Sequence, residues 1–150
     1  MKYLLILILT LISTASAAYS LSVEYGLSVD HLDYEGWMNE DNDFIAVEYV
    51  KGKHGVNSSS FVNTFGRQTF TLGGSYSLYS NSFFDFGVLY GVVKGYNKGE
   101  IDTVIDKDFG VYFAPRVTVK YKIYKNISAK VSSQLFGSAV VTSAGLEIKF

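Results

Sequence analysis

The side chains best suited to chemistry in this sequence are two histidines, His31 and His54, and a group of carboxylates between them. The carboxylates belong to Asp33, Glu35, Glu40, Asp41 and Asp43. Such oxygen ligands suit Ca²⁺, but their spacing does not match an EF-hand loop, and a solvated acidic loop explains them better. The sequence also lacks a nucleophile elbow, a P-loop, a zinc-ligand spacing and a dinucleotide fingerprint. We therefore expect neither a metal nor a cofactor.

The final stretch, residues 140–150, alternates between an apolar face and a mostly polar face. Leu146, Ile148 and Phe150 share the first face, and Glu147 and Lys149 share the second. A period of two predicts a β-strand. A chain that ends in such a strand, on an aromatic residue, resembles the closing strand of a bacterial outer-membrane barrel. The last strand of a soluble sandwich is the alternative.

The first 17 residues predict a secretory signal peptide. Lys2 precedes the apolar run 4–12, and small residues 15–17 fit a cleavage site. Cleavage would leave one domain, residues 18–150, which has no cysteine and therefore no disulfide framework. We expect Sec-type export to the outer membrane. The formal net charge of −1 offers no basic excess for nucleic acid, so that partner class is excluded.

The domain starts in a strand whose polar face carries acids. Val23 and Leu27 lie on one face, while Glu24 and Asp30 lie on the other, so the apolar face is expected to point outward, against lipid. Similar alternation predicts strands at 20–31, 44–51, 56–65, 69–79, 83–96, 109–122, 127–135 and 140–150. We therefore predict an all-β fold, an eight-stranded antiparallel up-and-down transmembrane β-barrel. About ten residues per strand suffice to cross a bilayer at a tilt.

An even number of strands places both termini at the periplasmic end. Long loops are expected outside at 32–43 and 96–108, with short turns inside near 51–55, 80–82 and 124–126. Side chains fill so narrow a barrel, which argues against a general porin. The inward charges should form ion pairs because the lumen is dry; they are Glu24, Glu48, Lys120, Lys122, Lys130, Glu147 and Lys149.

Residues 51–76 suggest a family. They contain the pair His54-Gly55, the segment Phe61-Val62-Asn63-Thr64-Phe65 and the segment Gly73-Gly74-Ser75-Tyr76. This pattern resembles the third and fourth strands of the lipid A palmitoyltransferases, which are eight-stranded outer-membrane acyltransferases. His31 followed by Asn39-Glu40, and the segment 115–121 that begins with Pro115, are weaker similarities. The likeness touches most of the mature chain.

The resemblance implies a catalytic site of His31, Asn63 and Thr64. These residues take the places of the family's His, Asp and Ser, which move a palmitoyl chain from a phospholipid to lipid A. Asn63 offers no charge to stabilise an imidazolium, and strand spacing separates the tops of the first and third strands by about 10 Å. The resemblance also implies lipid-binding roles for Gly73 and Ser75 near the acyl pocket. It implies a lateral gap at Pro115, which lacks a backbone donor.

We therefore predict a monomeric barrel that binds lipid or modifies the envelope, with acyl transfer weak or absent. Its expected partners are phospholipid, lipopolysaccharide and the barrel-assembly machinery. A non-enzymatic surface barrel is one alternative. A small-solute transporter of the glycerol-3-phosphate type is another, since similar short barrels occur in bacteriophages with that label. The narrow lumen argues against transport.

Overall fold

A computed structural model describes residues 19–33, 35–40, 43–98, 100, 104–106 and 109–150 of the chain. The expected signal peptide, residues 1–17, lies outside these ranges, and so does Asp41 of the acidic group. Among the residues that the structure describes, no helix is long and apolar enough to cross a membrane.

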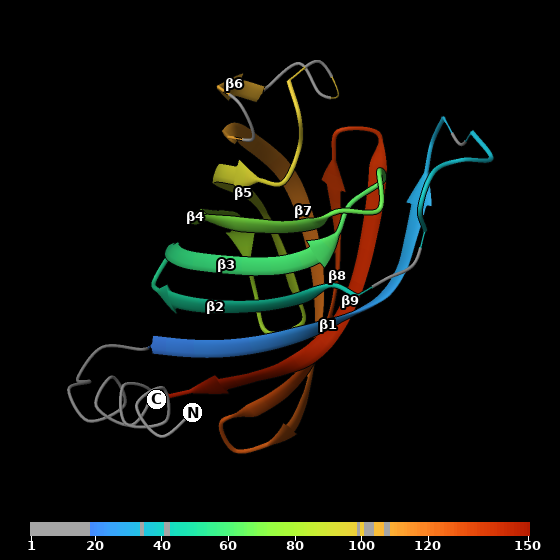
Figure 1. The fold of residues 1–150 in the computed structure, drawn as a ribbon. Helices are drawn as coiled ribbons and strands as arrows, with labels where there is room; N and C mark the ends of the chain where they lie inside the picture. The colour runs from blue at the N-terminus through green and yellow to red at the C-terminus, as the bar shows by residue number, and fades with distance from the viewer. Residues whose placement is uncertain (1–18, 34, 41–42, 99, 101–103, 107–108) are drawn as a thin grey trace, which may run out of the picture.

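The described chain forms a closed barrel of antiparallel strands (Figure 1). The strands are β1 (Tyr19–His31), β2 (Ile45–Lys51), β3 (His54–Val62), β4 (Gln68–Ser80), β5 (Phe84–Lys94), β6 (Val104–Asp106), β7 (Phe109–Tyr124), β8 (Ile127–Phe136) and β9 (Ala139–Lys149). Neighbours in sequence pair with one another, β1 pairs with β9, and β5 pairs with β7 past the short β6. Eight strands thus form the ring. Within the described chain, the short β6 pairs only with the first residues of β7 and is not part of the ring. The predicted eight-stranded barrel is confirmed.

The two ends of the barrel differ in the connections that they carry. The inner end carries Tyr19 and Phe150, whose backbones are joined by a 2.9 Å hydrogen bond from the Phe150 N–H to the Tyr19 carbonyl. The outer end carries the connections β1–β2, β3–β4, β5–β7 and β8–β9. The longest connections, β1–β2 and β5–β7, both lie at the outer end, as the sequence predicted.

Several predicted boundaries were wrong, and three of them change the picture of a loop or a turn. The turn expected at 51–55 covers only residues 52–53, so His54 is the first residue of β3 and its ring lies 5.0 Å from the ring of Tyr76. The third strand ends at Val62 rather than at Phe65. The loop expected at 96–108 contains β6. Gly52, at φ 61°, allows the tight turn that lets pairing continue to His54.

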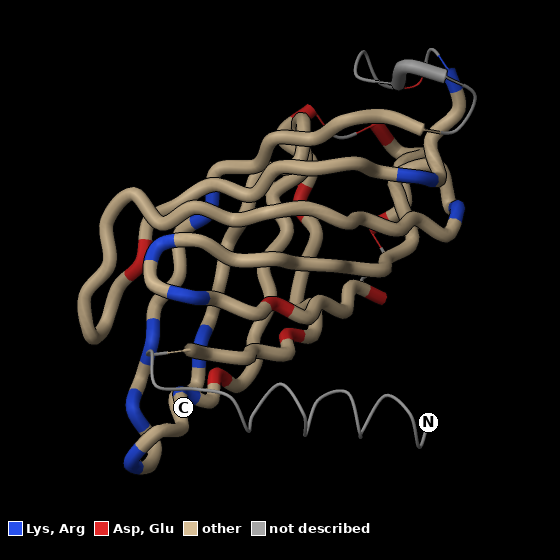
Figure 2. Tube along the Cα trace, turned by 90° about the vertical axis from the view of Figure 1, so that its left-hand side faces the viewer, with Lys and Arg blue, Asp and Glu red and all other residues tan. Residues whose placement is uncertain are grey.

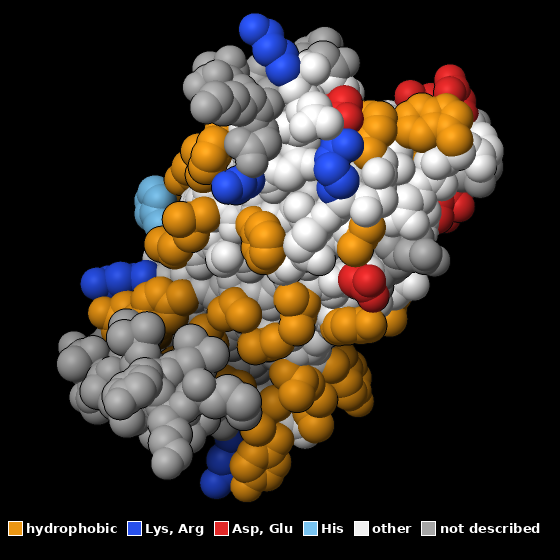
Figure 3. Space-filling view, viewed as in Figure 1, with side chains coloured by type: hydrophobic (Ala, Val, Ile, Leu, Met, Phe, Trp, Pro, Cys, Tyr) orange, Lys and Arg blue, Asp and Glu red, His pale blue; other side chains and the backbone are white. Residues whose placement is uncertain are grey.

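The barrel is apolar outside and polar inside. Large exposed hydrophobic side chains project from every strand of the ring, among them Val23, Ile45, Val56, Leu72, Tyr90, Phe113, Val131 and Leu146. Most of the buried side chains are polar or charged, including Thr118, Ser132 and Ser143, which are at most 1% exposed. Figure 3 shows hydrophobic side chains gathered over the strands, with acidic ones beside the β1–β2 loop. This inverted arrangement suits a lipid surround and confirms the predicted outward apolar face.

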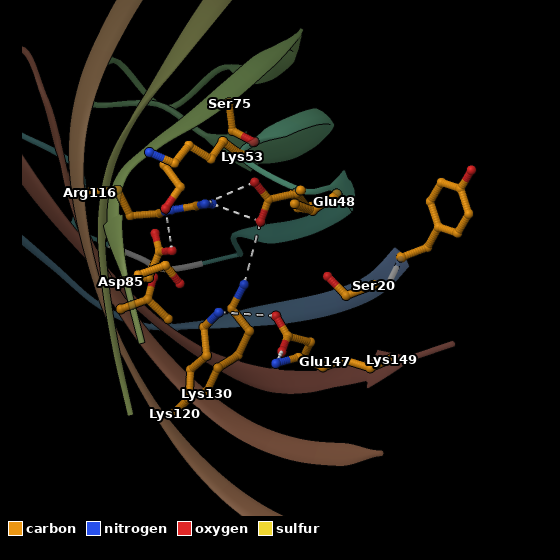
Figure 4. A pocket seen from close by; sticks show the side chains of 16 residues that line it. Ser20, Glu48, Lys53, Ser75, Asp85, Arg116, Lys120, Lys130, Glu147 and Lys149 are labelled. Carbon is orange, nitrogen blue, oxygen red and sulfur yellow. Dashed lines mark hydrogen bonds and ion pairs between the residues drawn. The ribbon is translucent and has the colours of Figure 1, made fainter. Parts of the chain in front are cut away.

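Ion pairs cross the barrel interior (Figure 4). Arg116 of β7 donates two hydrogen bonds to Glu48 of β2, at 3.0 and 2.9 Å. Lys130 of β8 lies 2.8 Å from Glu24 of β1 and 3.5 Å from Glu48. Glu147 lies within ion-pair distance of both its cations, Lys120 and Lys149, at 3.4 and 3.5 Å. The predicted internal pairing is confirmed, but the prediction omitted Arg116 and wrongly included Lys122, which is exposed because β7 extends beyond the interior at the inner end.

A lysine on the lipid face should destabilise the barrel. Leu72 lies on β4 and is 59% exposed, whereas Leu32 lies in the β1–β2 loop and is 72% exposed. Leu72→Lys should lower the free energy of unfolding in a bilayer by about 2–4 kcal/mol, because an ammonium there must enter hydrocarbon. Leu32→Lys is the matched control and should change it little. Equilibrium unfolding, followed by the gel mobility of unheated samples, measures both, and equal effects would contradict a lipid-facing β4.

Reversing the central acid should also destabilise the barrel. In Glu48→Lys the new ammonium would face both Arg116 and Lys130, and we expect a loss of about 3–5 kcal/mol, as for other broken buried pairs. Adding Arg116→Glu should recover part of that loss. Lys125→Glu, an exposed reversal in the β7–β8 turn, is the control. Unfolding of the refolded barrels in one detergent provides the comparison, and a Glu48→Lys barrel as stable as the control would indicate a wet, open lumen.

Candidate functional site

A β-bulge in β1 turns His31 toward the barrel interior. The pairing of β1 with β9 shifts between Gly26 and Ser28, which inserts one residue and inverts the faces that follow. Strict alternation places Asp30 inward, and that prediction was wrong, because Asp30 is exposed. His31 instead lines a cavity at the outer end, with its side chain only 2% exposed.

The β1–β2 loop crosses the barrel mouth and is held against the β3–β4 loop. The Asn39 N–H donates a 2.9 Å hydrogen bond to the Thr64 carbonyl. The Asn39 side-chain amide donates to the Asn63 carbonyl at 3.3 Å. The rings of Trp37 and Phe65 pack against each other at a tilt of 33°, with centroids 5.4 Å apart. These contacts bypass β2 and close the gap of about 10 Å that strand spacing alone would leave.

The structure brings His31 and Thr64 into direct contact. His31 Nε2 lies 2.8 Å from Thr64 Oγ1. When Nε2 is unprotonated it accepts the hydroxyl hydrogen, which is the arrangement of a base beside a nucleophile. Glu40 approaches the other side of the ring, with Oε1 3.6 Å from His31 Nδ1. That distance exceeds a hydrogen bond, and among the described residues the buried Nδ1 has no hydrogen-bond partner.

Asn63 holds the β3–β4 loop in shape. Its Oδ1 accepts hydrogen bonds from the backbone N–H groups of Phe65 and Arg67, at 2.9 and 3.1 Å. Its Nδ2 donates to the Gly95 carbonyl at 2.9 Å, and the residue is 2% exposed. These hydrogen bonds join Asn63 to its own loop and to Gly95, the residue just after β5. Glu40, rather than Asn63, therefore lies where a third group could orient the imidazole.

The His31–Thr64 pair lies in the wall of a cavity of about 470 Å³. Its apolar lining comes from Trp37, Met38, Phe44, Phe61, Val62, Phe65, Phe136, Ala139 and Val141. The volume falls within the range of small-molecule sites, and apolar walls with a few polar groups are typical of them. The cavity can hold part of an apolar chain beside one hydroxyl. Among the described residues, no three His, Asp or Glu side chains group closely enough to hold a metal ion.

Polar groups from the β5–β7 connection close one side of the cavity. Burial, helped by the charge of Glu100, raises the pKa of Tyr96 to about 12, so the phenol stays neutral at neutral pH. Partial desolvation opposes ionisation of Glu100, but a hydrogen bond from Arg67 and one from the Asn97 N–H outweigh it and lower the pKa of that carboxyl. Arg67 also donates to the Gly95 carbonyl at 3.2 Å. An ion pair thus links the β3–β4 loop to the β5–β7 connection.

Gly73 and Ser75, expected beside an acyl chain, lie away from this cavity. A Cβ at Gly73 would clash with the backbone carbonyl oxygen of Tyr90 and lie 2.8 Å from the Tyr112 hydroxyl, which donates to Asn57 Oδ1 at 2.8 Å, so the backbone of β5 and the Tyr112 side chain fill the volume that the glycine leaves. Ser75 is 4% exposed and lines a polar cavity at the inner end. The structure therefore separates these two residues from His31 and Thr64.

Pro115 lies within β7 at the point where one of its two ladders stops. It pairs with Val88 of β5, but pairing with β8 begins only at the next residue, Arg116, opposite Gln134. The outer half of β7 therefore extends past the short β8 with only β5, and briefly β6, beside it. The lateral gap predicted at this proline remains a prediction, and the end of the ladder is consistent with it.

Sequence reasoning missed two features of the site. Glu40 was assigned to a solvated acidic loop. Its position next to Asn39, nine residues after His31, could have indicated a place near His31, because Asn39 anchors this loop. Arg67 and Glu100 carried no signal, because their contact joins two loops that are distant in sequence.

The fold can be compared with known proteins at this point. The sequence matches no protein-family model and no curated protein. Ail of Yersinia pestis, solved in a bilayer nanodisc, is 13% identical, with a TM-score of 0.53 over 90% of this chain and 100% of Ail. Neisserial surface protein A is 14% identical, with a TM-score of 0.51 over 90% of this chain and 98% of that one. This chain thus has the fold of small outer-membrane β-barrels.

The N-terminal barrel of Pseudomonas aeruginosa OprF shares the fold as well. It is 9% identical, with a TM-score of 0.50 over 89% of this chain and 98% of that domain. Identities this low establish the arrangement of strands only. The function has to be argued from the site itself.

Restoring an acid at position 63 should weaken the loop without helping His31. Asn63→Asp removes the donor to Gly95 and sets a carboxylate against that carbonyl, which should lower the free energy of unfolding by about 1–3 kcal/mol. Asn81→Asp is the matched control, since the exposed Asn81 also accepts two backbone N–H bonds, at 2.8 Å each. Denaturant unfolding of both variants measures the difference. An Asn63→Asp barrel as stable as Asn81→Asp would contradict the role assigned to Gly95.

Proposed function

We propose that this chain resides in a bacterial outer membrane and binds the acyl part of an envelope lipid in its outer cavity. The single observation that carries the proposal is the apolar cavity of about 470 Å³ with a His–Thr pair in its wall. The outward hydrophobic face supports the membrane location, because such a surface is stable against lipid and not against water. In that membrane, with both termini on the periplasmic side, the cavity at the outer end would lie near the lipids of the outer leaflet.

The geometry favours binding over turnover. Thr64 has a base at 2.8 Å, but no residue that the structure describes forms a hydrogen bond with His31 Nδ1 that would fix the tautomer of the ring. Glu40 stands off at 3.6 Å, and its side chain is 43% exposed. A triad that lacks the orienting group loses most of its rate. Acyl transfer at Thr64, which the family resemblance implies, is therefore proposed to be weak or absent, and the chain acts mainly as a lipid-binding, envelope-modifying barrel.

Passage of a solute receives no support from the interior. Arg116, Glu48 and Lys130 join opposite walls of the barrel, between the outer cavity and the inner end. A transported solute would have to break these desolvated pairs, at a cost of several kcal/mol. If the lipid-binding test below fails, the function that remains is display of the outer loops by a barrel that binds no lipid.

Narrowing the outer cavity should reduce lipid binding. Val141 is 6% exposed and lines the cavity, whereas Val131 on β8 is 46% exposed on the outer face. In Val141→Phe, excluding two methylene groups of the ligand forfeits about 1.6 kcal/mol, so affinity for a diacyl phospholipid should fall about tenfold. Val131→Phe, the same exchange on the outer face, should leave affinity unchanged. Native mass spectrometry of the barrel released from detergent, with stepwise addition of the phospholipid, measures both.

Chemistry is tested separately in cells. The wild-type chain and Thr64→Val are expressed in a Gram-negative strain without its own palmitoyltransferase, and lipid A is weighed. We expect the same lipid A mass for both. A species heavier by one acyl chain, absent with Thr64→Val and His31→Ala, would overturn the binding-only part. Equal lipid affinity in Val141→Phe and Val131→Phe would overturn the outer cavity as the binding site.

A further inference from the structure

A second cavity, of about 210 Å³, opens among the polar side chains at the inner end of the barrel (Figure 4). Its lining comes from the start of β1, β2, the β2–β3 turn, the end of β4, the start of β5, β7, β8 and the end of β9. This cavity shares no residue with the outer cavity. The proposed lipid site therefore does not account for it.

Cations outnumber anions in the lining. The bases are Lys53, Arg116, Lys120, Lys130 and Lys149, and the acids are Glu48, Asp85 and Glu147. Lys130 also pairs with Glu24, outside the lining, which still leaves one positive charge in excess. Figure 2 shows Lys and Arg residues gathered at the barrel end where the C-terminus lies.

The excess is concentrated at two places. Glu147 serves two ammonium groups at once, those of Lys120 and Lys149, at 3.4 and 3.5 Å. Lys53, in the β2–β3 turn, forms no ion pair with any residue that the structure describes. Asp85, at the start of β5, accepts a 2.6 Å hydrogen bond from the Ser77 hydroxyl and keeps its negative charge, so the excess of one positive charge counted above is unchanged.

Unused hydrogen-bond donors accompany this charge. The side chain of Arg116 is 10% exposed, and both of its terminal nitrogens bond Glu48. Its buried Nε–H has no hydrogen-bond partner in the part of the chain that the structure describes. An unpaired buried donor is costly and favours an acceptor at that position. Hydroxyl groups of Ser20, Ser75, Ser80 and Thr118 also line the cavity, and two of them are already engaged, Ser75 with Glu48 and Thr118 with Ser132.

We propose that this inner cavity binds a phosphate group. Phosphate presents several acceptor oxygens and more than one negative charge near neutral pH, which matches a cavity of lysines, hydroxyls and a free guanidinium N–H. The volume is below the range of about 300–1,000 Å³ for drug-sized ligands, so the ligand is a small ion or a headgroup. The ion pairs above the cavity make it a closed-ended site, entered from the inner end.

Binding is tested with inorganic phosphate on the full mature barrel in phosphatidylcholine nanodiscs. Calorimetric titration at constant ionic strength, with chloride as the reference, should show one saturable site. Lys53→Gln should weaken it at least about fivefold, since one unit charge at contact distance contributes about 1 kcal/mol even in water. Lys125→Gln removes a lysine from the neighbouring inner turn that does not line the cavity, and it should leave affinity unchanged. Gel mobility of unheated samples verifies that both variants are folded.

A second arm separates a free phosphate from a lipid headgroup. The titration is repeated in nanodiscs that contain phosphatidylglycerol. If the lipid headgroup occupies the cavity, it competes with phosphate, and phosphate affinity is lower in these discs than in phosphatidylcholine discs. The difference between the two kinds of disc should then be smaller for Lys53→Gln. This result would assign the site to inner-leaflet lipid. If affinity is unchanged, the site takes free phosphate. No saturable binding in phosphatidylcholine discs, or equal losses in Lys53→Gln and Lys125→Gln, would overturn the proposal.

Discussion

The pairing of Glu48 with Arg116 and Lys130 is the interaction on which the rest of this barrel depends. Because the outside must be apolar to face lipid, the inside of the ring receives the polar side chains, and those charges lose their water. Glu48 of β2 bonds Arg116 of β7 and lies 3.5 Å from Lys130 of β8. These contacts join strands from opposite parts of the ring. The interior charges therefore meet their partners only when the barrel closes.

The same pairs divide the interior into two compartments with different chemistry. Toward the outer end the lining is dominated by Phe44, Phe61 and Phe136, while toward the inner end it is dominated by lysines and hydroxyls. An acyl chain suits the first compartment and a phosphate group suits the second. A barrel of this size can therefore offer two unlike sites without a channel between them.

The outer site exists because one strand and one loop depart from the regular pattern. The bulge after Gly26 turns His31 inward, and it lies where β1 separates from β2, since their ladder ends at Tyr25. The freed loop then crosses to the β3–β4 connection and is anchored there by Asn39. Irregularities of this kind are common beside functional sites, because they re-aim a side chain that regular pleating would direct elsewhere.

The sequence by itself determined the number of strands in the ring, the outward apolar face, which two loops are long and most of the inward charges. All of these follow from a period of two and from local turn residues, which can be read along the chain; Glu24, Glu48 and Lys130 are examples. Only the tertiary structure decided that His31 points inward, that it meets Thr64 across 33 positions, and that Glu40 rather than Asn63 stands beside its ring. It also added Arg116, 68 positions from Glu48. Alternation is a local property, whereas a bulge that shifts register and the choice of partners across a closed ring depend on the whole barrel.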